Sequence, residues 1–193
     1  MGRKKTQEQR VQEKIRIEKL IPGGMGLGSN SEGKKVMLLN TLAGEVVGEF
    51  VVLRDKSSYL EGVATKILEQ SPERIPPRDE CFLSTSPFQI MNYETELKVK
   101  KELIGEMFRK LIHPEVLVIK TDGNEFYYRN KMEYSFWYDM ETGENSLAFH
   151  RRGTHQKITI QQSSIERKEI FRKAERIVAK MNERHDDSRK YQS

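Results

Sequence analysis

Short apolar stretches alternate with turn residues over the first seventy residues, and this spacing restricts the fold more than any other feature. The apolar stretches read KIRIEKLI at 14–21, KKVMLLN at 34–40, VVGEFVVLR at 46–54 and YLEGVATKILEQ at 59–70; the turns read PGGMGLG, TLAGE and RDKSSY. Closely spaced short strands with no helical periodicity between them are typical of small antiparallel barrels. The sequence therefore predicts an antiparallel β-barrel over residues 14–70.

A proline-rich segment follows the predicted barrel. Residues 71–92 hold four of the six prolines in the chain. Proline fixes the backbone angle φ and removes a hydrogen-bond donor. We therefore expect an extended connector there rather than a packed element.

The second half combines helical and strand patterns. Apolar residues at helical spacing predict a helix that is capped by Asn92 and ends at His113-Pro114. Alternation predicts strands at 115–121, 128–139, 145–153 and 157–162, and a capping box from Ser163 to Glu166 predicts a last helix running through Met181. The predicted fold class is α+β, with a basic flexible tail at 1–13, the barrel at 14–70, the connector at 71–92, a central α/β domain of antiparallel strands and two helices at 93–185, and a polar tail at 186–193.

Charge and cysteine content narrow the class of protein. The 193 residues carry a formal net charge of +5 and include one cysteine, Cys81. A basic balance permits a polyanionic partner, although basic residues also serve solubility. A single cysteine excludes an internal disulfide framework and fits a reducing compartment, and no apolar run is long enough to cross a bilayer. We expect a cytoplasmic protein with no membrane partner.

The usual signatures of enzymatic chemistry are poorly matched. Gly23 and Gly28 have the spacing of a Walker loop, but Ser29-Asn30 stands where lysine and a hydroxyl residue are needed. The four histidines are scattered, and Cys81 has no evident activating base. We therefore predict no catalytic residue, no metal site and no cofactor bound by this chain.

The segment FYYRNKMEYSFWYD at 126–139 holds seven of the sixteen aromatic residues. Strand alternation would place one set of side chains in the core, namely Tyr128, Asn130, Met132, Tyr134, Phe136 and Tyr138. The opposite face would carry Arg129 and Lys131, and the neighbouring hairpin adds Arg151 and Arg152. Cations beside aromatic rings are typical of surfaces that bind single-stranded nucleic acid. Purely structural aromatics with a solvated basic face remain the alternative.

Three quoted stretches resemble one family of RNA-modifying enzymes. IEKLIPGGMGLGSN with KKVMLLNTLAGEVV resembles the TRAM domain, a small OB-like RNA-binding barrel. YYRNKMEYSF followed by LAFHRRGTHQKITI resembles the central domain of the RNA uridine-5 methyltransferases, and FQIMNYETELKVKKELIGE is similar to the segment that joins the two. The match covers about residues 14–185, and the order of its three parts is more specific than the TRAM motif alone.

The resemblance implies methylation of carbon 5 of a uridine in ribosomal or transfer RNA. In that family the reactive cysteine, the assisting carboxylate and the S-adenosylmethionine site lie in a C-terminal Rossmann-like domain, and this sequence stops about where that domain would begin. Many relatives also hold an iron–sulfur cluster on four cysteines. Here Ser86 and Ser163 or Ser164 fall at two of those places and only Cys81 is a cysteine, so we predict no iron–sulfur cluster.

The resemblance implies that this chain binds RNA. It assigns Arg129 a place near the RNA and the catalytic pocket, followed by Lys131, Arg151 and Arg152, and by Lys19, Gly24 and Gly26 in the barrel. We predict the RNA-binding N-terminal portion of an RNA (uracil-5-)-methyltransferase that positions rRNA or tRNA. Its catalytic domain is either a separately encoded partner or lost from this chain by truncation. The alternatives are a stand-alone RNA-binding or chaperone module and a protein-interaction adaptor.

Overall fold

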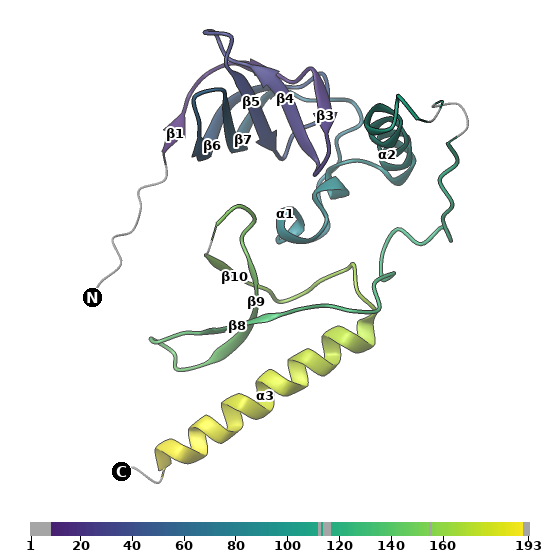
Figure 1. Cartoon of the computed structure of the whole chain (residues 1–193). Coiled ribbons are helices and arrows are strands. Elements are labelled where there is room, and N and C mark those ends of the chain that lie inside the picture. The colour runs from purple at the N-terminus through teal and green to yellow at the C-terminus, as the bar shows by residue number, and fades with distance from the viewer. Residues whose placement is uncertain (1–8, 112, 114–116, 155, 191–193) are drawn as a thin grey trace. The chain divides into compact units, whose positions relative to one another are not determined.

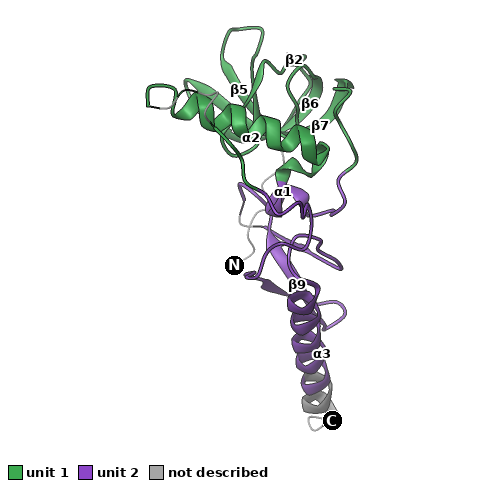
Figure 2. Cartoon of the chain, turned by 90° about the vertical axis from the view of Figure 1, so that its right-hand side faces the viewer, with its two compact units in different colours: residues 1–76, 87–120 green, residues 77–86, 121–193 purple. Residues whose placement is uncertain are grey.

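The computed structural model describes residues 9–111, 113, 117–154 and 156–190. The fold is α+β, and the chain divides into two compact units (Figure 2). Unit 1 comprises residues 1–76 and 87–120, and unit 2 comprises residues 77–86 and 121–193. No helix among the described residues is long and apolar enough to cross a membrane.

Unit 1 is a seven-stranded mixed sheet accompanied by two helices (Figure 1). Its elements are β1 (Arg10–Val11), β2 (Ile15–Arg16), β3 (Lys19–Ile21), β4 (Met25–Ser29), β5 (Lys35–Leu39), β6 (Val46–Asp55), β7 (Tyr59–Glu69), the 3-10 helix η1 (Pro87–Ile90) and α2 (Tyr93–Met107). The strand order is β1-β6-β7-β5-β4-β3, with β2 also paired to β6. β5 and β7 are parallel, and the other pairs are antiparallel.

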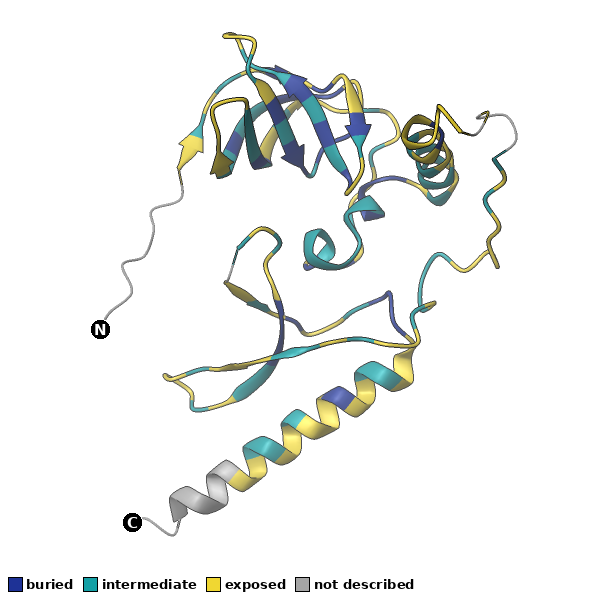
Figure 3. Ribbon diagram, viewed as in Figure 1, coloured by how far each residue is buried: buried dark blue, intermediate teal, exposed yellow. Residues whose placement is uncertain are grey.

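Alternating apolar residues build the core of unit 1, as the sequence predicts. Val36 and Leu38 on β5 and Phe50 on β6 are fully buried, together with Ile15 and Ile17 (Figure 3). Two features differ from the prediction. The parallel β5–β7 pair makes the sheet mixed, and the ladder of paired strands among the described residues runs from β1 to β3 without closing into a barrel.

β4 occupies a stretch that the sequence predicts to be a turn. Only the first two glycines of PGGMGLG form the turn, with Gly23 and Gly24 at positive φ. Gly26 and Gly28 lie within the strand because neighbouring chain passes close to them. A Cβ on Gly26 would lie 2.3 Å from Thr41 Oγ1, and one on Gly28 would lie 2.4 Å from the carbonyl oxygen of Arg16.

The proline-rich segment is folded, contrary to the predicted extended connector. Its first part includes the short helix α1 (Phe82–Thr85) of unit 2, and its second part includes η1 of unit 1. Ile90 and Met91 are each 2% exposed. The start of the helix that follows is confirmed, because Asn92 Oδ1 accepts the Thr95 amide at 2.8 Å and so caps α2. Its predicted end at His113-Pro114 is wrong, because α2 ends at Met107 and the chain continues in a turn. Because α2 belongs to unit 1, the two units divide the chain differently from the predicted domains.

Unit 2 is a three-stranded antiparallel sheet packed on one long helix. It contains β8 (Ser135–Tyr138), β9 (Asn145–His150), β10 (Lys157–Thr159) and α3 (Lys168–Lys190), with strand order β10-β9-β8 (Figure 1). Leu147 and Phe149 on β9 pack with Ala174 of α3, and Phe171 and Val178 extend the cluster. The predicted strands at 145–153 and 157–162 are confirmed in part, as β9 and β10.

Several boundaries in unit 2 and at the chain ends differ from the sequence prediction. α3 begins at Lys168 rather than at the predicted capping box, because the Glu166 side chain turns inward and accepts the Ser163 hydroxyl. The helix continues to Lys190, through most of the predicted polar tail. Residues 117–121 form no strand, and 115–116 lie outside the described residues. The predicted flexible tail at 1–13 lies outside the described residues up to residue 8. Its residues Arg10 and Val11 form β1, so this part of the tail is a paired strand, contrary to the prediction.

Candidate nucleic-acid interface

The segment around Arg129 pairs with the chain that leads into α3. The Tyr127 amide donates to the Ser164 carbonyl at 2.8 Å, and the Arg129 amide donates to the Ile165 carbonyl at 2.9 Å. The Arg167 amide returns a bond to the Arg129 carbonyl, also at 2.9 Å, which makes a parallel bridge. Arg129 is therefore held by backbone pairing outside the three-stranded sheet, although the sequence predicts it within a continuous strand.

Two cations lie against the ring of Tyr127. Arg78 Nη2 donates to the Tyr127 hydroxyl at 3.0 Å, and its guanidinium carbon is 4.7 Å from the Phe126 ring centroid. On α3, Lys168 Nζ is 4.7 Å from the Tyr127 ring centroid. Both cation positions are within the range of favourable cation–π attraction. We call Arg78, Phe126, Tyr127 and Lys168 the Tyr127 cluster.

The backbone of Tyr127 is strained. Its φ is +59°, in the left-handed region that residues other than glycine rarely adopt. Such conformations persist where surrounding contacts over-determine them, and they gather at binding and catalytic sites. Here two hydrogen bonds hold Tyr127 in place: its backbone amide donates to the Ser164 carbonyl, and its hydroxyl accepts from Arg78.

Two further cations belong to the backbone bridge beside this cluster, which also contains a buried carboxylate. Arg167 is exposed, and half-buried Arg129 donates through Nη2 to the Thr85 carbonyl at 3.3 Å. Beneath them, Glu166 is fully buried and accepts the Tyr134 hydroxyl at 2.6 Å. Burial and this hydrogen bond raise the pKa of the Tyr134 hydroxyl, so it stays a proton donor. The buried carboxylate partly offsets the positive charge above it.

Asp79 forms a second buried acidic contact. Its Oδ2 accepts the Ser164 amide at 3.0 Å and the Ser164 hydroxyl at 2.8 Å. Beside it, burial and the charge of Asp79 raise the pKa of the Cys81 thiol to about 11. A protonated thiol is a poor nucleophile and a poor metal ligand. Among the described residues, no group of three histidine, cysteine or acidic side chains is arranged to hold a metal ion.

The other predicted cations of unit 2 lie elsewhere. Lys131 is exposed and lies 3.4 Å from the Glu133 carboxylate, with both side chains more than 80% exposed. Arg151 and Arg152 belong to the turn between β9 and β10, in which the Thr154 amide donates to the Arg151 carbonyl. The structure thus places the predicted cations in three locations, and their role in RNA binding stays a prediction.

The predicted division of the aromatic segment into two faces is only partly right. Met132 and Tyr134 pack against the core of unit 2, and the Tyr134 ring stacks on Phe149 at 5.5 Å between centroids. Tyr128, Phe136 and Tyr138 were expected in the core but are 46%, 42% and 40% exposed. The strand is limited to β8, so simple alternation does not extend over the whole segment.

In unit 1, the predicted RNA-contacting lysine already has a partner. Lys19 Nζ pairs with Glu106 Oε1, a contact that lowers the pKa of the Glu106 carboxyl. The pair borders a cavity of about 320 Å3 that is also lined by Glu18, Glu73 and Glu102. RNA phosphates approaching Lys19 would meet these carboxylates. Gly24 and Gly26 are buried, and a Cβ at Gly24 would lie 3.0 Å from Pro87 Cγ.

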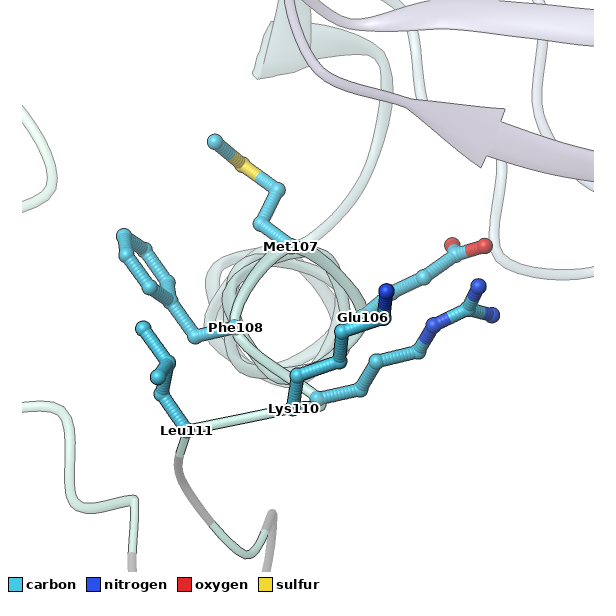
Figure 4. A pocket seen from close by; sticks show the side chains of 6 residues that line it. Glu106, Met107, Phe108, Lys110 and Leu111 are labelled. Atoms are coloured by element: carbon cyan, nitrogen blue, oxygen red, sulfur yellow. The ribbon is translucent and has the colours of Figure 1, made fainter.

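The end of α2 carries exposed apolar side chains. Met107, Phe108 and Leu111 are 60%, 42% and 81% exposed, and they point to one side of the helix while Glu106 and Lys110 point to the other (Figure 4). These side chains line a hollow of about 580 Å3. The charged side chains of Glu106, Arg109 and Lys110 also line it, and all three are exposed. We do not assign this hollow a function.

Sequence reasoning missed Arg78 and Lys168. Arg78 lies in the segment predicted to be a connector, and Lys168 lies in the predicted last helix. Arg78 is 49 residues from Tyr127 in the chain, and no local pattern indicates such a contact. The one available signal was the placement of Arg167-Lys168 at the start of a helix, where basic residues are unfavourable.

Several curated proteins similar to this chain are described as RNA methyltransferases. A protein of Thermotoga maritima described as an uncharacterized RNA methyltransferase is 34% identical over 127 residues, which cover 64% of this chain and 29% of the relative. An uncharacterized RNA methyltransferase of Caldanaerobacter subterraneus is 32% identical over 145 residues, covering 72% and 31%. This chain therefore spans about a third of the length of these relatives. No family model matches it.

One solved structure shares the fold. The Pyrococcus abyssi tRNA (uracil-54, C5)-methyltransferase, crystallised with S-adenosyl-L-homocysteine, superposes with a TM-score of 0.52 at 16% sequence identity. The similarity covers 84% of this chain and 35% of that protein. At this identity the likeness establishes a common fold over most of the chain.

Proposed function

We propose that this chain is the RNA-binding N-terminal portion of an RNA (uracil-5-)-methyltransferase. It would bind an rRNA or tRNA in the cytoplasm and position it so that a separate domain methylates a uridine. The relatives described as RNA methyltransferases and the shared fold of a tRNA uracil methyltransferase support this proposal. The observation that carries it is the pair of cations, Arg78 and Lys168, held against the strained Tyr127 beside Arg129.

These side chains suit recognition of RNA phosphates. Arginine and lysine bind phosphate oxygens through charge-assisted hydrogen bonds, and an aromatic ring offers a stacking surface for an unpaired base. Arg78, Arg167 and Lys168 are exposed, so a phosphate can reach them without unfolding the unit. We infer that they hold the RNA backbone while Arg129, fixed by its backbone bridge, orients the neighbouring nucleotide.

S-adenosylmethionine would be bound outside this chain. Cofactors that contain a nucleotide are often bound at a glycine-rich turn between a strand and the helix that follows it. Within the described residues, the turn from β10 to α3 contains no glycine, and the segment from β7 to α1 contains none either. The residues present do not fit the cofactor, so no step of the proposed function uses it here.

Salt-dependent RNA binding tests the proposal. We would measure the anisotropy of a labelled, uridine-containing stem-loop with the wild type and with an Arg78→Ala/Lys168→Ala double variant over a salt series. Loss of two phosphate contacts should weaken binding and lower the slope of log K against log salt by about one to two units. A Lys173→Ala/Arg176→Ala variant removes the same charge from the exposed surface of α3 and is the matched control.

Different results separate the alternatives. If the wild type does not bind RNA even at low salt, the proposal is wrong and a protein-interaction adaptor is favoured. The Lys173→Ala/Arg176→Ala control could lower the salt slope as much as Arg78→Ala/Lys168→Ala does. In that case RNA binds the basic surface without a defined site, and the assignment of the site is wrong. A stand-alone RNA-binding or chaperone module is favoured if the chain binds RNA tightly but does not support methylation when combined with the catalytic part of a relative.

A further inference from the structure

The aromatic residues of β8 are exposed on both faces of the strand. Phe136, Trp137 and Tyr138 are 42%, 45% and 40% exposed, and Met140 just beyond them is 89% exposed. Successive side chains in a strand point to opposite faces, so a strand packed on one face should bury every second residue. β8 departs from this rule because α3 packs mainly on β9, the central strand of the sheet.

The strand register places Trp137 on the same face as a cation. Trp137 is opposite Ser146 on β9, and Lys157 on β10 is opposite His150 on the same strand. Residues directly opposite each other, and those two apart along a strand, share a face, so Trp137, His150 and Lys157 lie on one side of the sheet. Lys157 Nζ donates to the Phe136 carbonyl at 2.7 Å, which brings its ammonium group to the backbone of β8.

Charge differs between the two ends of this strand. The turn between β9 and β10, which contains Arg151 and Arg152, lies beyond the first residue of β8. The turn between β8 and β9 follows the last residue of β8 and contains Asp139, Glu141 and Glu144. A polyanion on β8 would therefore place its phosphates toward Lys157 and the arginine turn and leave only bases near the acidic turn. The four residues of β8 span roughly 13 Å at about 3.3 Å each, which is enough for one or two stacked bases.

We propose that β8 is a stacking platform for one or two unpaired nucleotides, with Trp137 as its main contact and Lys157 beside the phosphate. This inference rests on the proposed RNA-binding function and specifies a second contact region for the same RNA. Unpaired bases are the favoured ligand because bases inside a duplex have their faces covered by neighbours, whereas unpaired bases stack on aromatic side chains. A protein segment added beside β8, an end strand of the three-stranded sheet, is the competing occupant.

Trp137 is the sole tryptophan of the chain, so its emission reports directly on this site. We would titrate the full chain with a ten-nucleotide oligouridylate and with a blunt RNA duplex of equal charge, and record tryptophan emission together with the anisotropy of labelled RNA. We expect the single strand to quench Trp137 and the duplex to leave its emission nearly unchanged. The emission of the wild type needs no variant and therefore does not depend on how a substitution folds.

Variants then measure the contribution of stacking. Trp137→Ala should weaken oligouridylate binding by about 5-fold to 150-fold, the range for one base–aromatic stack, and Trp137→Phe should retain most of the affinity. Phe108→Ala removes an aromatic residue of similar exposure at the C-cap of α2 and should change the affinity by less than about twofold. Circular dichroism checks that each variant is folded.

Each remaining outcome overturns a specific statement. If oligouridylate binds but neither quenches Trp137 nor loses affinity in Trp137→Ala, the stacking platform is wrong while RNA binding stands, and a protein occupant of the edge is favoured. If the duplex quenches as strongly as the single strand, selectivity for unpaired nucleotides is wrong. If neither RNA binds the wild type, the proposed function itself fails.

Discussion

The Arg74 guanidinium donates hydrogen bonds to both carboxylate oxygens of Glu45, with Nε 2.6 Å from Oε1 and Nη2 2.8 Å from Oε2. The Glu45 side chain is fully buried and that of Arg74 is 11% exposed. Glu45 also accepts the backbone amides of Leu42 and Ser71 at 2.8 and 3.1 Å. The Arg74–Glu45 ion pair therefore connects the turn before β6 with the segment that follows β7.

Removing the arginine should destabilise unit 1 strongly. Arg74→Ala would leave the buried Glu45 carboxylate without its cation, and breaking such a buried pair costs about 3–5 kcal/mol of unfolding free energy. Urea unfolding followed by far-ultraviolet circular dichroism measures this loss. The control is Arg54→Ala, whose pair with Glu61 is 3.2 Å long and partly exposed and should contribute less than about 1 kcal/mol. Equal losses in the two variants would contradict the structural role assigned to Arg74.

Gly26 should be intolerant of a methyl group whether or not RNA is present. A Cβ there would lie 2.3 Å from Thr41 Oγ1 and 2.6 Å from Ile17 Cγ2, so Gly26→Ala should cost at least about 1–3 kcal/mol by overpacking. Gly33→Asn is the control, because Gly33 has open space around it and asparagine tolerates its φ of +80°. Unfolding in urea without RNA compares them, and an unchanged midpoint for Gly26→Ala would show that packing does not require the glycine.

Local patterns predicted the elements whose stabilisation is local. The alternation in β5, β6 and β7 marks their buried faces, and Asn92 caps α2 as its sequence context indicates. β4 was missed because glycine normally signals a turn. Here Gly26 and Gly28 are required by the close approach of chain elsewhere in the sequence, which no local pattern reports.

The parts that could not be predicted depend on distant residues. The parallel pairing of β5 with β7 follows from the path of β6 around the sheet, not from the residues of either strand. Likewise, the motif indicates Arg129, but Arg78 and Lys168, which contact Tyr127 two residues before it, come from two other segments. A sequence read along the chain predicts which residues are basic and aromatic, but it does not say which of them meet.

The Ser164 hydroxyl should stabilise unit 2 through Asp79. Ser164→Ala removes the 2.8 Å hydrogen bond to a buried carboxylate, and bonds to charged groups contribute about 1.5–3 kcal/mol. Because Trp137 belongs to unit 2, its emission during urea unfolding reports the change there. Thr154→Ala loses an exposed hydroxyl contact with the Arg151 carbonyl and should have little effect. A similarly small effect of Ser164→Ala would show that the hydrogen bond to Asp79 does not stabilise unit 2.

The thiol of Cys81 should be unreactive in the folded protein. Its side chain is buried, and its pKa is raised from 9.0 to about 11 by burial and by the charges of Asp79 and Glu166. Below pH 9 the thiolate fraction is therefore about a hundredfold lower than in the unfolded chain. Alkylation by iodoacetamide should be at least that much slower in native protein than in urea. Rapid labelling of the native protein would contradict the buried, protonated thiol.

The same shift predicts how stability depends on pH. Because the folded-state pKa is the higher one, the folded protein holds this proton more tightly than the unfolded chain does. The resulting stabilisation is complete below about pH 9 and is lost as pH rises to about 11, by about 2–3 kcal/mol in all. Cys81→Ala lacks the titrating group, so the difference in unfolding free energy between wild type and variant should shrink across this interval. A difference that stays constant from pH 8 to pH 11 would show that the thiol titrates alike in both states.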